Sequence, residues 1–174
     1  MAVDVRLQIV TMLPRLRRFA RSLTGEIDRA DDLVQATCER ALRGIDGWQA
    51  GTRLDSWLYR IMQNLWIDEM RKRKTRGPEK PIEDAYNLTG EDGARVAEGR
   101  LATSEVMQAL DRLPEEQRAV ISLVCIEDVS YREAATILGI PVGTVMSRLA
   151  RSRLALADML GLAKQDATTT QAGT

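Results

Sequence analysis

The sequence predicts an all-α protein of two small helical domains joined by a flexible acidic linker, with a helix-turn-helix in the C-terminal domain. Three observations support this fold class. Apolar residues recur at three- and four-residue steps through most of the first 75 residues, strand patterns are nearly absent, and a stretch rich in glycine, proline and acids interrupts the periodicity. The domains are therefore expected at 1–75 and 101–162, with a linker at 76–100 and a disordered tail at 163–174.

Helical periodicity accounts for the first domain. A first helix is expected over about 4–24, where Pro14 kinks it or splits it in two. A second is expected over about 28–43, with Asp28 as its N-cap. A third runs over about 54–74 and ends in the basic sequence "RKRKTR". These elements give a bundle of three helices.

Two polar surfaces of this domain are candidates for binding. The second helix carries an outward acidic face, which is either ordinary solvated surface or a dock for a basic protein. The third helix combines aromatics with the basic run, a pattern that suits unstacked bases and phosphates but is also typical of an ordinary helical core. Trp48, in the loop before the third helix, is the better candidate for an exposed aromatic.

The stretch "SYREAATILGIPVGTVMSRL" predicts two short helices joined by a tight turn. Ser130 and Glu133 form an S-x-x-E capping box, which fixes a helix start. Gly139 fits the left-handed position just past a helix end. Pro141 or Val142 then opens the next helix. This spacing is that of a helix-turn-helix.

The second helix of this motif is expected to direct Val145 and Leu149 inward, at an i, i+4 step. In a DNA-binding helix-turn-helix this helix enters the major groove, where arginine, serine and threonine contact bases and phosphates. A solvated helix face in an ordinary bundle would carry similar residues. The outward candidates are Thr144, Met146, Ser147, Arg148 and Arg151.

Composition excludes several classes of function. Basic and acidic residues number 25 each, so the net charge identifies no partner. The chain has no histidine and only two cysteines, Cys38 and Cys125, so neither a metal site nor a disulfide framework is expected. No cofactor site or catalytic constellation is evident, so the protein is not expected to be an enzyme. No apolar run approaches the roughly 20 residues that span a bilayer, and a cytoplasmic protein is expected.

Three stretches in order resemble the extracytoplasmic-function sigma factors, the smallest sigma subunits of bacterial RNA polymerase in the sigma-70 superfamily. They are "DRADDLVQATCERAL", "GTRLDSWLYRIMQNLWIDEMRKRK" and "LDRLPEEQRAVISLVCIEDVSYREAATILGIPVGTVMSRLARSRLAL". The similarity covers about 15–160. The combination is specific, whereas the helix-turn-helix alone would not be.

The resemblance implies a role for each domain. The first would dock on core RNA polymerase through Asp31, Asp32, Gln35 and Glu39. It would also read and open the −10 promoter element through Trp48, Arg53, Arg60, Asn64, Asp68 and Arg71. The second would read the −35 element through Thr144, Met146, Ser147, Arg148 and Arg151. The resemblance also implies promoter DNA as a partner and control by an anti-sigma factor.

Two other functions are compatible with parts of this pattern. A stand-alone helix-turn-helix regulator would bind duplex DNA without polymerase, usually as a dimer on a palindrome. A helical adaptor would need no DNA-binding face, and the basic recognition helix argues against it. Co-elution with core polymerase at one-to-one distinguishes a sigma factor from both.

Overall fold

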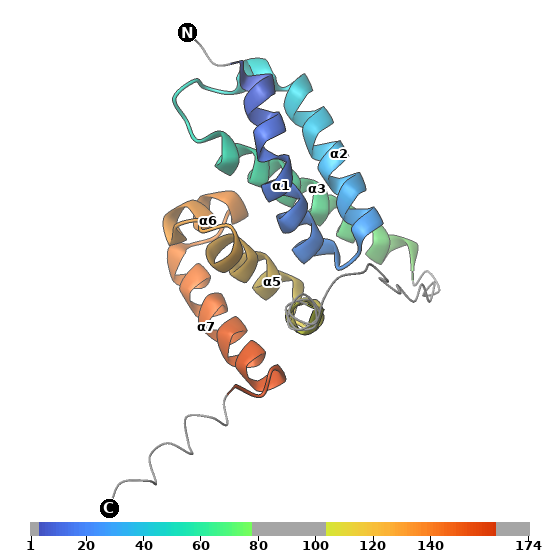
Figure 1. Ribbon diagram of the computed structural model, residues 1–174, viewed down its shortest axis with the longest axis vertical. Helices are drawn as coiled ribbons and strands as arrows, with labels where there is room; N and C mark the ends of the chain where they lie inside the picture. Colours follow the sequence, from blue (N-terminus) through green and yellow to red (C-terminus); the bar gives the residue numbers. More distant parts are fainter. Residues whose placement is uncertain (1–3, 78–103, 163–174) are drawn as a thin grey trace, which may run out of the picture.

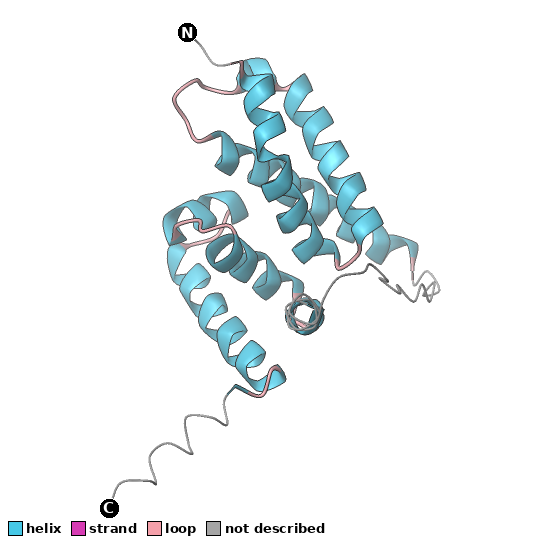
Figure 2. Cartoon of the chain, viewed as in Figure 1, coloured by secondary structure: helices cyan, strands magenta, loops and turns pink. Residues whose placement is uncertain are grey.

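The computed structural model describes residues 4–77 and 104–162, and within these ranges every regular element is helical (Figure 1, Figure 2). The predicted all-α class with two helical domains is confirmed. The predicted tail, and the predicted linker apart from Arg76 and Gly77, lie outside the described residues. Among the described helices, none is long and apolar enough to cross a membrane.

Three long helices form the N-terminal half: α1 (Val5–Thr24), α2 (Ile27–Arg43) and α3 (Leu54–Arg76). A short 3-10 turn, η1 (Ile45–Gly47), follows α2. Pro14 lies inside an unbroken α1, so of the two expected outcomes, a kink or a split, the split is wrong. Pro14 is on the exposed surface, and so is Val10, four residues earlier. Water can therefore satisfy the Val10 carbonyl that lacks its helical donor.

The junction between α1 and α2 also differs from the prediction. Gly25, at φ 76°, ends α1 in the left-handed conformation, and α2 then begins at Ile27 with Glu26 as its N-cap. Asp28 therefore lies in the first turn of α2 and is not the predicted cap. A Cβ atom on Gly25 would lie 2.9 Å from Asp111 Oδ1, so glycine also permits close approach of the helical segment 104–111.

The C-terminal half contains the segment 104–111 and four further elements: α5 (Glu115–Ile121), η2 (Ser122–Ile126), α6 (Tyr131–Leu138) and α7 (Val142–Met159). η2 is a π-helical turn, closed by a hydrogen bond of 3.0 Å from Glu127 N–H to the Ser122 carbonyl. Asp128 follows at φ 54°, an uncommon conformation in which aspartate is enriched, and redirects the chain into α6.

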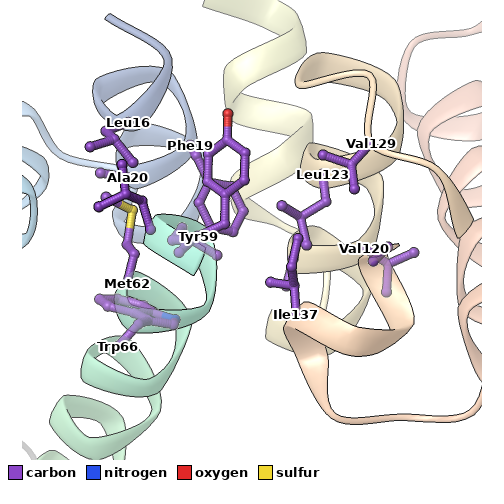
Figure 3. Packing of buried hydrophobic residues seen from close by; sticks show 14 of the residues in the cluster. Leu16, Phe19, Ala20, Tyr59, Met62, Trp66, Val120, Leu123, Val129 and Ile137 are labelled. Carbon is purple, nitrogen blue, oxygen red and sulfur yellow. The ribbon is translucent and has the colours of Figure 1, made fainter. Parts of the chain in front are cut away.

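The two halves share one apolar core (Figure 3). On one side lie buried side chains of α1 and α3, where Phe19 and Tyr59 pack edge to face with ring centroids 5.2 Å apart. On the other side lie buried side chains that include Leu123 of η2 and Ile137 of α6. Contacts of α1 with α5 and η2, and of α3 with α6, bring the halves directly together.

Candidate nucleic-acid interface

The helix-turn-helix has the predicted local geometry. The Ser130 hydroxyl accepts a hydrogen bond of 3.2 Å from Glu133 N–H and caps α6. Gly139, at φ 65°, ends α6 in the left-handed conformation, with its N–H bonded to the Ala135 carbonyl. The Ile140 N–H donates to the same carbonyl at 3.1 Å. These bonds satisfy the backbone at both ends of α6 and set the start of α7.

The two faces of α7 separate as the sequence predicts. Val145 is fully buried and Leu149 is 2% exposed, so both hold the helix against the core. On the opposite face Met146 is 52% exposed, and Ser147 and Arg151 are exposed as well. The helix therefore offers a polar outer surface without exposing its core contacts.

The other two candidates on α7, Thr144 and Arg148, are half-buried. The Arg148 guanidinium forms an ion pair of 2.9 Å with the Glu116 carboxylate of α5, and its side chain is 24% exposed. No sequence pattern indicates this pairing, because Glu116 lies in a separate helix far earlier in the chain. Arg148 can contact DNA only if Glu116 releases it or if the pair is shared with a phosphate or base.

Four of the candidates for the −10 element form a continuous face along α3. All four are exposed, and their spacing of four, four and three residues keeps them on one side of the helix: Arg60, Asn64, Asp68 and Arg71. The Arg71 and Asp68 side chains form an ion pair of 3.8 Å. Beyond this face α3 ends in the exposed basic residues of "RKRKTR".

Trp48 and Arg53 do not lie on that face. Trp48 is half-buried and packs against the apolar core, and its indole Nε1 is enclosed without a hydrogen-bond partner. The expectation of an exposed aromatic therefore holds only in part. Arg53 sits at the start of α3 and forms ion pairs of 2.6 Å with Asp55 and 2.7 Å with Glu133 of α6.

The electrostatics around Arg53 are strong for a surface site. Its hydrogen bond to Asp55 raises the pKa of the guanidinium further above its ordinary value. Burial alone would raise the pKa of the Asp55 carboxyl. Hydrogen bonds from Arg53 and from the Ser56 N–H, together with the charges of Arg53 and Arg15, outweigh burial and lower that pKa below its ordinary value. Asp55 is thus held as a carboxylate between two arginines.

The predicted docking residues lie together on the exposed face of α2: Asp31, Asp32, Gln35 and Glu39. Their internal contacts are weak surface pairs. Asp31 lies 3.8 Å from the Arg17 guanidinium of α1, and Glu39 lies 3.6 Å from that of Arg43. Gln35 donates a hydrogen bond of 3.2 Å to Glu39. This acidic face remains available to a basic partner.

A cavity of about 210 Å³ lies between α3 and the C-terminal half. Arg71 of α3 and Arg148 of α7 both line it, together with Gln63, Glu116 and Leu138. Gln63 is 6% exposed, and its side-chain oxygen has no hydrogen-bond partner. The structure thus brings one candidate for the −10 element and one for the −35 element to the same small cavity. In the described part of the chain no cluster of side chains could hold a metal ion.

Comparison with known proteins assigns both halves. Residues 9–63 match the family described as the sigma2 domain of PhyR, and residues 103–156 match sigma-70, region 4. The ECF RNA polymerase sigma factor EcfG of Rhodopseudomonas palustris is 41% identical over 157 residues, which are 90% of this chain and 85% of that protein. This chain is an extracytoplasmic-function sigma factor. The predicted family is thereby confirmed.

Other relatives of this sigma factor agree with that assignment. The ECF RNA polymerase sigma factor SigW of Bacillus subtilis is 34% identical, and the alignment covers 79% of each chain. Among solved structures, the sigma factor RpoE in complex with the anti-sigma factor NepR from Bartonella quintana gives a TM-score of 0.74 at 30% identity, covering 91% of this chain and 97% of that one. CnrH in complex with the cytosolic domain of CnrY gives 0.66 at 27% identity, covering 90% and 86%.

Membership of this family fixes the class of function. Sigma factors bind core RNA polymerase and promoter DNA to start transcription, and they are not enzymes. A stand-alone regulator and a helical adaptor are therefore set aside.

Proposed function

We propose that this sigma factor uses its N-terminal half to dock on core RNA polymerase and open the −10 element, and its C-terminal half to read the −35 element. The observation that supports this division most strongly is the helix-turn-helix of α6 and α7. It buries Val145 and Leu149 while it exposes Met146, Ser147 and Arg151. That arrangement presents a recognition helix to the major groove without disturbing the core.

Readout of the −35 element is assigned to the outer face of α7. Arg151 and Arg148 carry guanidinium groups that can bind guanine with two hydrogen bonds or pair with phosphates. Thr144 and Ser147 have hydroxyls that can serve either role. Met146 offers an apolar surface that suits the methyl group of thymine. Together these five side chains provide both positioning and base-reading contacts.

Opening of the −10 element is assigned to α3 and the loop before it. Arg60, Asn64 and Arg71 give α3 a polar, basic face that can follow a separated strand, and Asp68 completes that face. Arg53 is placed at the start of the helix, and Trp48 supplies an indole for stacking. An unstacked base costs a few kcal/mol to extrude, which stacking and hydrogen bonds must offset. Trp48 would have to leave part of its packing to stack on a base.

Docking on the polymerase is assigned to the acidic face of α2, through Asp31, Asp32, Gln35 and Glu39. Its exposure and its weak internal pairing favour this role, since the face can bind a basic surface without unfolding anything. Control by an anti-sigma factor is part of the proposal, because the similar RpoE and CnrH structures are complexes with NepR and with the cytosolic domain of CnrY. Its place of action is then the cytoplasm, where polymerase and promoters are found.

The test of this function is assembly followed by transcription. The sigma factor should co-elute with core RNA polymerase at one-to-one, and the resulting holoenzyme should start run-off transcripts at discrete genomic sites upstream of which shared −10 and −35 sequences occur. Duplex binding without polymerase, together with failure to co-elute, would contradict the proposal. Sequencing of the transcript ends identifies the promoter sequence.

A further inference from the structure

A buried carboxylate of the C-terminal half inserts into the N-terminal half. Glu127, directly after η2, is 2% exposed, and its side chain is entirely shielded from solvent. One carboxylate oxygen accepts a hydrogen bond of 3.2 Å from Arg18 Nε. The other accepts from the Tyr59 hydroxyl at 2.8 Å, from Arg15 Nε at 3.3 Å and from Arg18 Nη2 at 3.3 Å. We call Glu127, Arg15, Arg18 and Tyr59 the Glu127 cluster.

The Glu127 cluster joins elements far apart in sequence. Arg15 and Arg18 belong to α1 and Tyr59 to α3, so all three donors come from the N-terminal half. The backbone takes part as well, since Arg15 Nη2 donates to the Glu127 carbonyl at 2.9 Å. Nearby, the Arg53–Glu133 ion pair of 2.7 Å is a second charged contact between the halves. The closed arrangement is therefore specified by matched charges as well as by apolar packing.

The chemistry of the cluster makes this contact reversible. A carboxylate loses much hydration energy on burial, and paired donors recover roughly that amount. Arg15 and Arg18 keep side-chain exposures of 31% and 52%, so neither is trapped without water. Burial and, to a smaller extent, the hydrogen bond to Glu127 raise the pKa of Tyr59, so its hydroxyl remains a donor. If the halves separate, water can replace the protein partners of Glu127, Arg15, Arg18 and Tyr59.

The closed arrangement cannot engage both promoter elements at once. The −10 and −35 elements lie about 25 base pairs apart, which is about 85 Å of B-form DNA at 3.4 Å per base pair. A compact chain of 174 residues has a radius of gyration of about 16 Å. Here Arg71 and Arg148, assigned to different elements, line one cavity of about 210 Å³. The chain between Gly77 and Ser104 could reach about 90 Å if fully extended, so the halves can separate that far.

We propose that Glu127 is a latch that holds the free sigma factor closed, and that release of the Glu127 cluster precedes engagement of polymerase and promoter. Only the second part of this inference, that release precedes binding, rests on the proposed function. The closed state itself is a property of the chain alone. A substitution that weakens the latch raises the fraction of open molecules. It changes the association with polymerase by changing that fraction.

The first test is small-angle X-ray scattering of the full-length chain. Glu127→Ala removes the acceptor of all four side-chain hydrogen bonds and leaves the Tyr59 hydroxyl buried without a partner, so the radius of gyration should rise clearly. Glu127→Gln still accepts from Tyr59 but lacks the charge, so it should give an intermediate value. Glu105→Gln makes the same chemical change at an exposed position and should leave the radius unchanged.

A second set of variants removes the arginine donors that the N-terminal half contributes to the Glu127 cluster. The double variant Arg15→Ala, Arg18→Ala should open the chain about as far as Glu127→Ala. Adding Glu127→Ala to it should open the chain little further, because both changes remove the same contact. Circular dichroism must show unchanged helix content in every variant. Opening by Glu127→Ala without opening by the double variant would show a local folding defect and would overturn the latch.

The final measurement is the rate at which each full-length chain associates with core RNA polymerase. Glu127→Ala and the arginine double variant should associate faster, by on the order of tenfold, than the wild type and Glu105→Gln. A radius of gyration that does not change in Glu127→Ala overturns the latch, and so does opening without faster association. Failure of every chain to bind polymerase, wild type included, contradicts the proposed function, and the scattering data then decide whether the latch exists.

Discussion

Arg148 on the recognition helix α7 is held by Glu116 of α5, with 2.9 Å between guanidinium nitrogen and carboxylate oxygen. The Glu116 side chain is 70% exposed to solvent, so the ion pair contributes little to stability. A phosphate or a guanine edge offers Arg148 an equal or better acceptor. Glu116 is therefore placed to compete with DNA for this side chain.

The first prediction concerns this competition. Glu116→Gln should raise the affinity of holoenzyme for promoter DNA by roughly two- to fivefold, since an exposed ion pair contributes about 0–1 kcal/mol. The gain should shrink at high salt, where surface charges are screened. Fluorescence anisotropy with labelled promoter duplex measures the effect, and Glu105→Gln is the control. An unchanged affinity at low salt would show that Glu116 does not compete.

The second prediction concerns readout of the −35 element. Arg148→Ala should cost about 1–3 kcal/mol and relax the preference at one base pair if Arg148 reads a base edge. If it contacts only phosphate, affinity should fall evenly across sequences and the salt slope should become shallower by about one. Binding of holoenzyme to duplexes varied through the −35 region, at two salt concentrations, separates these outcomes.

Two further variants complete that experiment, one on the same helix face and one as a folding control. The double variant Arg148→Ala, Arg151→Ala should lose more affinity than either single change. If it kept full affinity and full preference, α7 would have no role in recognition. Val145→Asp is the contrasting control, because it places an unpaired charge at a fully buried position and should unfold the C-terminal half.

The third prediction concerns the polymerase dock. Replacing Asp31 and Asp32 together with lysine should weaken binding to core polymerase by at least tenfold and leave helix content intact, since both side chains are exposed. The matched control is lysine at Asp46 and Asp158, which changes the net charge equally at exposed positions that are not among the predicted docking residues. Gel filtration and surface plasmon resonance measure binding. Equal losses in the two double variants would indicate a general charge effect in place of a dock.

The fourth prediction concerns acid stability. The pKa of Asp55 in the folded state lies below its ordinary value of 3.8, so Asp55 stabilises the fold above that pH, and the contribution disappears as pH falls through the lower folded-state pKa. Asp55→Asn should therefore destabilise the protein at pH 7, and its deficit relative to wild type should shrink toward pH 3. Urea unfolding at several pH values measures this, with Asp46→Asn as the exposed control. A deficit independent of pH would assign the effect to packing.

The sequence was sufficient where structure depends on near neighbours. The cap at Ser130, the left-handed Gly139 and the inward Val145 and Leu149 follow from residues at most a few positions apart, and each was predicted. The acidic face of α2 follows equally from helical spacing. Asp28 lies two residues after the actual N-cap, Glu26, because the conformation of Gly25 rather than the aspartate sets where α2 begins.

Contacts between distant segments could not be predicted in the same way. Glu127 sits in the polar sequence "EDVS", which gives no sign that its side chain is buried among residues of α1 and α3. The partners of Arg53 and Arg148 depend on how the halves and helices pack, and no spacing rule contains that information. Trp48 shows the same limit, since its loop position suggested exposure while its indole packs on the core.

The π-helical turn Ser122–Ile126 makes chain length critical at one point. A π turn already holds one residue more than an α turn, so it cannot absorb a further one, and inserting a single residue here would turn everything that follows by about 100°, the rotation per residue of an α-helix. The carboxylate of Glu127 would then point away from Arg15, Arg18 and Tyr59, and α6 would begin in a different direction. Substitutions in this turn can therefore be tolerated where packing allows, whereas an insertion of one residue cannot. In related chains that keep this closed arrangement, we expect the number of residues between α5 and α6 to vary less than their identity.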